Sequence, residues 1–100
     1  MSTITGGSGN DSQAGTTGWD TIYGGAGNDT AAGYGGDDQI FGGTGADLIY
    51  AGGGNDIGLG GAGNDTSYGD VGNDSLLGGG DADVIYGGAG MDALLGDHGV

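Results

Sequence analysis

An aspartate recurs every nine residues along most of this chain of 100 residues. The chain has 14 carboxylate side chains and no Lys or Arg to pair with them. Carboxylates gathered in one place repel one another, and they are preferred ligands of hard divalent cations. We therefore expect any fold that brings them together to bind cations. The ten aspartates of the series are Asp11, Asp20, Asp29, Asp38, Asp47, Asp56, Asp65, Asp74, Asp83 and Asp92.

These aspartates hold the sixth position of a nine-residue repeat that runs without a gap from Gly6 to Leu95. Position one is Gly except at Ala51, and position four is Gly except at Asp81. Glycine permits tight turns with positive φ and lets backbone carbonyls point inward as further oxygen ligands. About six oxygen ligands in a flexible loop suit calcium better than zinc or copper. The repeat therefore predicts calcium sites in its loops.

The last three positions of each repeat are rich in β-branched and aromatic residues, as in Thr21–Tyr23 and Val84–Tyr86. Such triplets predict short strands whose middle side chain faces opposite to its neighbours. A three-residue strand is not stable alone and must stack on copies of itself, as in a solenoid. With two repeats per coil, residues 18 apart would stack at about 4.8 Å in two parallel sheets.

The middle position of each triplet should form a thin interior. Ala31, Ile49 and Ile85 would line one sheet, and Ile22, Ile40, Leu76 and Leu94 the other. Gln13, Gly58 and Ser67 are expected weak points of this interior. We predict one all-β domain over residues 1–100, in which 1–5 and 96–100 are partial repeats around ten complete ones in 6–95.

Stacking places each aspartate over the aspartate one coil later, beginning with Asp11 over Asp29. Without ions, each neighbouring pair would repel by about 1 to 4 kcal/mol. Several such pairs exceed the ~5 to 15 kcal/mol by which a typical domain is stable. We therefore predict that the chain does not fold without cations.

Composition argues against several other functions. A net charge of −14 disfavours nucleic acids and anionic lipid surfaces, and no apolar run is long enough to span a membrane. There is no cysteine and no N-terminal signal peptide pattern. An enzyme is not expected, because no nucleophile stands beside a base and the single His98 has no evident partner.

The repeats resemble the nonapeptide GGxGxDxUx of RTX (repeats-in-toxin) calcium-binding proteins, and "GGAGNDT" at residues 24–30 and 60–66 carries this resemblance most clearly. The resemblance implies a right-handed parallel β-roll with 18 residues per coil and about 5.5 coils. It also implies folding on calcium and an extracellular or cell-surface location. Each ion would lie between loops 18 residues apart.

Carried over to this chain, each ion would bind the Asp and the carbonyls of positions two and four in one loop, and the Asp and the carbonyls of positions one and three one coil later. Eight such loop pairs imply about eight ions, and a ninth site would lie near Asp83, Gly96 and His98. The implied carbonyl ligands belong to Gly24, Gly42, Gly60, Gly78 and Gly87 (position one), Gly7, Gly25, Gly43 and Gly61 (position two), Ala26, Thr44, Ala62, Gly80 and Ala89 (position three), and Gly9, Gly27, Gly45 and Gly63 (position four).

Three roles remain open at the level of the sequence. The first is an extracellular structural element whose copies associate head to tail into a filament or surface layer. The second is an excised folding or secretion module of a larger secreted enzyme, adhesin or toxin. Ice binding ranks below both, because the outward series Thr21, Gln39, Ile57 is not a regular Thr ladder. The ninth-position ladder of Tyr50, Tyr68 and Tyr86 is interpreted as cross-strand packing, with a partner surface as the alternative.

Overall fold

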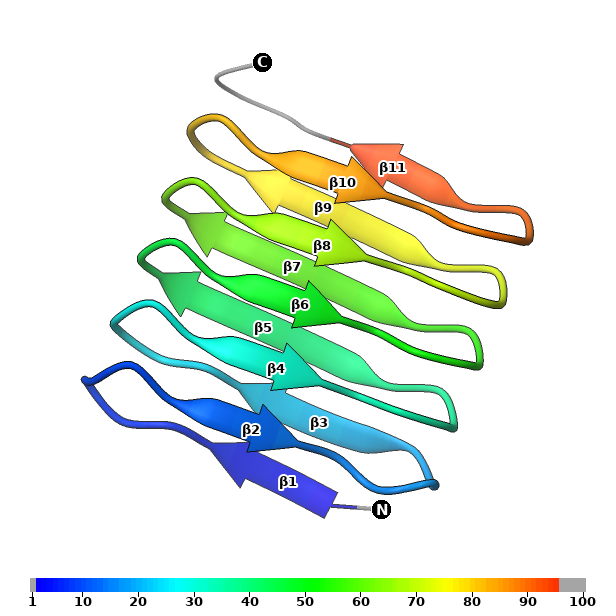
Figure 1. Ribbon diagram of the computed structural model, residues 1–100, viewed down its shortest axis with the longest axis horizontal. Coiled ribbons are helices and arrows are strands. Elements are labelled where there is room, and N and C mark those ends of the chain that lie inside the picture. Colours follow the sequence, from blue (N-terminus) through cyan, green and yellow to red (C-terminus); the bar gives the residue numbers. More distant parts are fainter. Residues whose placement is uncertain (1, 96–100) are drawn as a thin grey trace.

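The computed structural model describes residues 2–95 as two stacked layers of parallel strands, with no helix among these residues (Figure 1). One sheet, here the odd sheet, has the order β1-β3-β5-β7-β9-β11, and the other, the even sheet, has the order β10-β8-β6-β4-β2. The strands are β1 (Ser2–Thr5), β2 (Ser12–Ala14), β3 (Asp20–Tyr23), β4 (Thr30–Ala32), β5 (Gln39–Thr44), β6 (Leu48–Tyr50), β7 (Ile57–Ala62), β8 (Thr66–Tyr68), β9 (Ser75–Gly79), β10 (Val84–Tyr86) and β11 (Ala93–Leu95).

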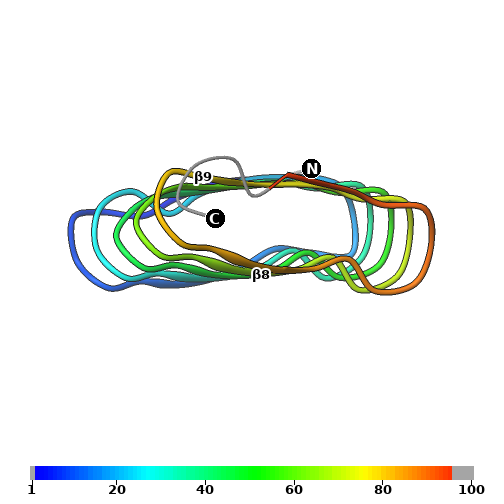
Figure 2. The same cartoon turned by 90° about the horizontal axis from the view of Figure 1, so that it is seen from above.

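Every strand pairs with the strand one coil later at a register of 18 residues. Ile22 lies beside Ile40 in the odd sheet, and Ala31 lies beside Ile49 in the even sheet. Successive repeats therefore alternate between the two sheets and wind a β-solenoid of about five coils, as the nine-residue period predicted. Seen from above, the two sheets form flat layers joined by loops at both sides (Figure 2).

The interior is a single layer of inward side chains between the two sheets. Ile22, Ile40, Ile49 and Leu76 are completely buried there. A Cβ on Gly58 would lie 2.9 Å from Cδ2 of Leu76, so the leucine already occupies the space that this expected weak point leaves open. The whole body measures 28 × 28 × 12 Å, which leaves little depth for an apolar core.

Gln13 is a weak point of the interior as predicted, whereas the burial of Leu94 and Ile85 and the length of some strands differ from expectation. Gln13 is buried and donates from Nε2 to the Tyr23 carbonyl at 3.0 Å, while its Oε1 has no partner. Leu94 is 47% exposed because it lies on the outermost described strand, and Ile85 is only partly buried. Pairing through Gly43 and Gly61 extends β5 and β7 to six residues instead of the predicted three.

Asparagines at position five tie successive loops together outside the sheets. The N–H of Asn28 donates to Oδ1 of Asn10, and the N–H of Ala46 donates to Oδ1 of Asn28, both at 2.8 Å. The opposite side has the same pattern, with Met91 donating to Asn73 at 2.8 Å. These side chains therefore hold the loops in register. No helix long and apolar enough to cross a membrane occurs in residues 2–95.

Candidate metal centre

The position-six aspartates end each loop and point into the body of the solenoid. From Asp20 to Asp74, all seven are exposed by 3% or less. This burial follows from the repeat, because the outward seventh position comes next in the strand and alternation turns the sixth position inward. The aspartates therefore form two buried columns, one inside each row of loops.

Within each column, neighbouring aspartates are joined by a hydrogen bond. The backbone N–H of Asp47 donates to Oδ1 of Asp65 at 2.8 Å, and the N–H of Asp20 donates to Oδ1 of Asp38 at 2.7 Å. The same bond joins all eight pairs that the sequence placed 18 residues apart. The aspartates that the sequence placed one coil apart are therefore direct neighbours. In each pair the bond occupies only Oδ1 of the accepting carboxylate.

The second oxygen of most of these carboxylates is buried without any hydrogen-bond partner. A buried polar atom in a native fold is nearly always paired, and an unpaired charged oxygen is especially unfavourable. The repetition of this feature in successive loops indicates a missing positive group. The unpaired atoms are Oδ2 of Asp29, Asp38, Asp47, Asp56, Asp65, Asp74 and Asp83.

Position one is glycine in every loop with an unpaired oxygen except that of Asp56, where it is Ala51, and these glycines leave a small space beside the oxygen. A Cβ built on Gly42 would lie 2.7 Å from Oδ2 of Asp47 and 2.7 Å from the carbonyl oxygen of Gly60. A Cβ on Gly69 would likewise lie 2.7 Å from Oδ2 of Asp74 and 2.6 Å from the Gly87 carbonyl oxygen. The carboxylate of one loop and the position-one carbonyl of the next coil therefore face the same space.

The glycines at positions two and four bring further carbonyls to the loop stack. Gly25 and Gly27 have φ of 92° and 95°, and a Cβ on either would lie 2.5 Å from the carbonyl oxygen of Gly7 or Gly9 respectively. These carbonyls point toward the loop one coil later. Some of them also accept backbone hydrogen bonds, as when Ala26 N–H donates to Gly7 O at 3.2 Å.

Where glycine is replaced in this pattern, the loop conformation is kept at three positions. Tyr34, Asp70 and Asp81 have φ of 69°, 69° and 71°, which a side chain makes unfavourable by about 1 to 2 kcal/mol. The loops therefore keep their shape even where Asp70 and Asp81 add negative charge. Thr16, which replaces glycine at position two, does not have a positive φ. It contacts Asp20 of its own loop through its backbone N–H and its hydroxyl.

In the first coil, both candidate carboxylates are satisfied by their own loops. Thr16 donates to Oδ2 of Asp20 from its backbone N–H at 2.6 Å, and its Oγ1 lies 3.1 Å from Asp20 Oδ1. Gly7 N–H donates to Oδ2 of Asp11 at 2.9 Å. The hydrogen bond from the Thr16 backbone lowers the pKa of Asp20, although burial acts in the opposite direction.

In the middle coils the pKa values of the buried carboxylates are raised, in contrast to that of Asp20. Burial, with the neighbouring charges of Asp38 and Asp74, raises the pKa of Asp56 to about 7. Burial and the charge of Asp47 likewise raise the pKa of Asp65 to about 7, and burial raises that of Asp38 to about 6. Near neutral pH these buried groups therefore hold protons more readily than ordinary carboxylates do, unless a cation replaces the proton.

The donors along the loops are all oxygens. Within residues 2–95 no three acidic or histidine side chains converge on one point, so each candidate site combines two carboxylates with backbone carbonyls. Paired carboxylates and carbonyls in flexible loops fit calcium and do not fit soft or strictly octahedral metals. The predicted ninth site, with Gly96 and His98, lies outside the described residues.

Comparison with known proteins points to the same metal. The family model of the RTX calcium-binding nonapeptide repeat matches the chain four times, at residues 2–13, 14–49, 32–67 and 68–99. Together the matches cover nearly the whole chain. No curated protein and no solved structure gives a significant match.

Proposed function

Because the chain belongs to the RTX calcium-binding nonapeptide repeat family, we propose that it is a structural β-roll that folds by binding calcium between its loops. One observation carries this proposal: in successive loops a buried aspartate Oδ2 has no hydrogen-bond donor and faces a carbonyl of the next coil. A calcium ion supplies positive charge to both oxygens. The residues present therefore fit the ion that the family implies.

The proposed sites use the ten position-six aspartates, two for each ion. In a site of the middle coils, Asp47 and Asp65 would contribute carboxylates, while Gly43, Gly45, Gly60 and Ala62 would contribute carbonyls. Eight such sites would bring a charge of about +16 to a chain of −14. Near-neutralisation of this kind couples metal binding to folding, because the ion-free columns repel themselves.

This proposal gives the chain a structural role, since ions held wholly by protein oxygens leave no coordination position for a substrate. We place the folded roll outside the cell, where members of the family typically act. It would serve there either as an independent element or as the calcium-dependent module of a larger secreted protein. Head-to-tail association is compatible with the first role, because β1 and β11 are the outermost described strands of the odd sheet and a second copy can pair with such an edge.

Native mass spectrometry on the calcium-loaded chain tests the number of sites. We expect about eight bound ions that load within a narrow range of calcium concentration, since each coil is stabilised by its neighbours. The variant Asp56→Asn should retain about six, because Asp56 takes part in two pairs. Two or fewer ions in the unmodified chain would contradict the proposed ligand sets, and equal loading by magnesium would contradict the choice of metal.

A further inference from the structure

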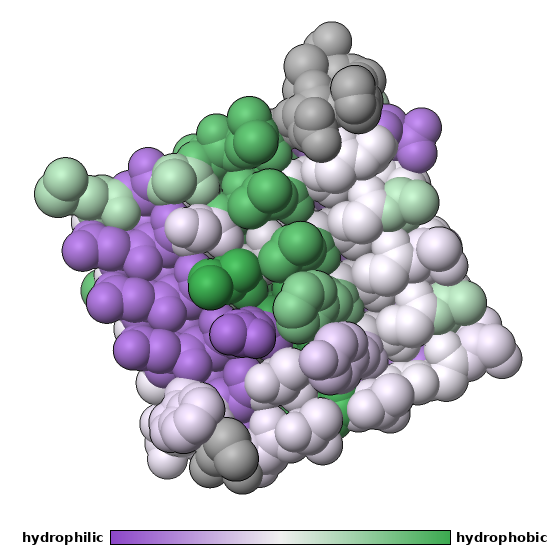
Figure 3. All heavy atoms as spheres, turned by 180° about the vertical axis from the view of Figure 1, so that it is seen from behind, coloured by the Kyte–Doolittle hydropathy of each residue, from purple (hydrophilic) through white to green (hydrophobic). Residues whose placement is uncertain are grey.

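The outward face of the odd sheet carries an uninterrupted row of apolar side chains (Figure 3). They occupy the ninth position of the repeat in successive odd strands, with one neighbour at the seventh position. Tyr23 and Ile57 are exposed by 43% and 41%, whereas Phe41, Leu59 and Leu77 are partly exposed. We call this row the apolar stripe; its residues are Tyr23, Phe41, Ile57, Leu59, Leu77 and Leu95.

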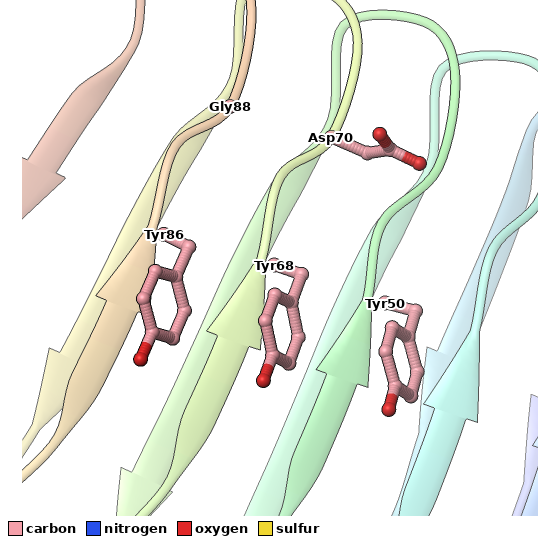
Figure 4. Close-up of a pocket in the computed structure, with 5 residues that line it drawn as sticks. All are labelled: Tyr50, Tyr68, Asp70, Tyr86 and Gly88. Carbon is pink, nitrogen blue, oxygen red and sulfur yellow. The ribbon is translucent and has the colours of Figure 1, made fainter.

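The even sheet presents a different surface at the same position of the repeat. Tyr50, Tyr68 and Tyr86 stack there with ring centroids 5.1 and 4.9 Å apart, and interplanar angles of 7° and 8°. Figure 4 shows the three rings side by side with the Asp70 carboxylate near them. A shallow cavity of about 330 Å³ lies along this ladder, lined also by Asp70 and Gly88. The ninth positions of this face therefore end in phenol hydroxyls from β6 to β10, although Leu48 and Val84 add apolar surface at the seventh position.

We infer that the folded chain forms a two-fold dimer in which the apolar stripes of two copies pack against each other. The inference rests on the proposed calcium-folded roll, because the stripe exists only when the odd strands are stacked. Its six side chains come from five strands that are separated by long stretches of sequence. In an unfolded chain they present no continuous surface to a partner.

The size of the face suits such a dimer. The backbone spans 28 by 28 Å across the broad face, or about 780 Å², so two copies that cover nearly the whole face would reach the size of a standard interface. A standard stable interface buries ~800 Å² on each partner, with an apolar centre and a polar rim. The stripe runs along the middle of this face, and Thr3, Gln39 and Ser75 lie beside it on the outward positions of the same sheet.

The distribution of charge permits two odd sheets to meet. All outward positions of the odd sheet, from Thr3 to Leu95, are uncharged, since its aspartates point inward or lie on loops. When two odd sheets pack face to face, no carboxylates therefore meet at the centre of the interface. Calcium also reduces the repulsion between two chains of −14, so folding and association should depend on the same ion.

Sedimentation equilibrium in calcium tests the dimer, with Leu59→Ser on the stripe and Tyr68→Ser at the matching position of the even sheet. We expect the unmodified chain and Tyr68→Ser to form dimers. Leu59→Ser should weaken the dimer by about a hundredfold, because a two-fold interface loses the side chain twice. A monomer at all concentrations, or a dimer lost only in Tyr68→Ser, would overturn the inference, and so would long polymers unaffected by Leu59→Ser.

Cross-linking through single introduced cysteines provides a second test, which does not require a substitution that weakens the interface. The chain has no cysteine of its own, so any disulfide must come from the introduced residue. Ile57→Cys on the odd sheet should form disulfide-linked dimers in calcium under mild oxidation, whereas Thr66→Cys on the even sheet should not. Equal cross-linking of both variants would contradict the assigned face. Circular dichroism of the same samples separates the two proposals: a chain that gains no β-structure in calcium contradicts the calcium-folded roll, whereas a folded monomer contradicts only the dimer.

Discussion

Asp20 in the first coil and Asp56 two coils later hold the same position of the repeat and the same column of the fold. Asp20 accepts hydrogen bonds from Thr16, which lower its pKa. Oδ2 of Asp56 has no donor, and burial with the charges of Asp38 and Asp74 raises its pKa to about 7. The proposed requirement for a cation would therefore come from stacking and burial in the middle coils, and not from the aspartate alone.

The largest expected effect comes from removing a carboxylate of the middle coils. Asp56→Ala takes a ligand from two proposed sites, whereas Asp20→Ala takes one from a single site at the end of a column. We expect Asp56→Ala to raise the calcium concentration at the folding midpoint at least about tenfold, and Asp20→Ala to raise it clearly less. Calcium titrations followed by circular dichroism measure both. Equal shifts would show that the two coils depend on calcium to the same extent.

A second prediction concerns pH in the presence of chelator. For Asp38, Asp56 and Asp65 the folded pKa is raised, so their contribution to stability is fully present below about 4 and is lost as the pH rises through about 6 to 7. The lowered pKa of Asp20 acts in the opposite sense, but in one group only. The ion-free chain should therefore gain β-structure on acidification from pH 8 to pH 4.

Circular dichroism between these pH values checks this prediction. The variant Asp56→Asn, which cannot ionise at that position, should need less acid to gain the same signal. A signal independent of pH in the unmodified chain would mean that the buried carboxylates do not oppose folding. In calcium the dependence reverses, because protons compete with the ion for the same oxygens.

Two glycines of the middle coils should respond differently to the same substitution. Gly43 has a φ of 98°, and a Cβ on it would collide with the Gly25 carbonyl, whereas Gly53 has nothing within 4 Å of the same atom. Gly43→Ala should cost about 1 to 2 kcal/mol or more in calcium. Gly53→Ala should be neutral or stabilise the fold by up to about 1 kcal/mol. Thermal unfolding measures both effects, and equal stability of the two variants would contradict the prediction.

The smallest effect should come from Thr16 in the first coil. Thr16→Val removes the hydroxyl near Asp20 but keeps the backbone N–H bond at 2.6 Å. The hydroxyl also accepts a hydrogen bond from the Gly18 N–H at 3.1 Å, but that group is exposed and water can replace the bond, so we expect a loss of about 0.5 to 1.5 kcal/mol in calcium. Thr30→Val on the outward face of the even sheet is the matched control. A larger loss than for Gly43→Ala would mean that the first coil contributes more to stability than the carbonyl stack does.

The repeat made most of the fold predictable from the sequence. A fixed period of nine residues determines which residues stack, so the 18-residue register and all eight aspartate pairs followed from Asp11 to Asp92. The state of each carboxylate did not follow, because it depends on the residues that stack on it. In the first coil the backbone N–H groups of Gly7 and Thr16 donate to the aspartate of their own loop, so this donor depends on the place of the loop in the stack and not on the change from Gly to Thr. The way Leu76 fills the space beside Gly58 likewise depends on packing. Exposure of the apolar stripe also depends on the packing of the sheets.

Small-angle X-ray scattering at low protein concentration, with chelator and then with millimolar calcium at neutral pH, tests whether calcium folds the chain. In chelator we expect a radius of gyration near the ~30 Å of an unfolded chain of this length. Calcium should reduce it toward the 11.8 Å of the folded backbone. A compact particle in chelator, or an expanded chain in calcium, would contradict the claim that calcium between the loops folds this protein.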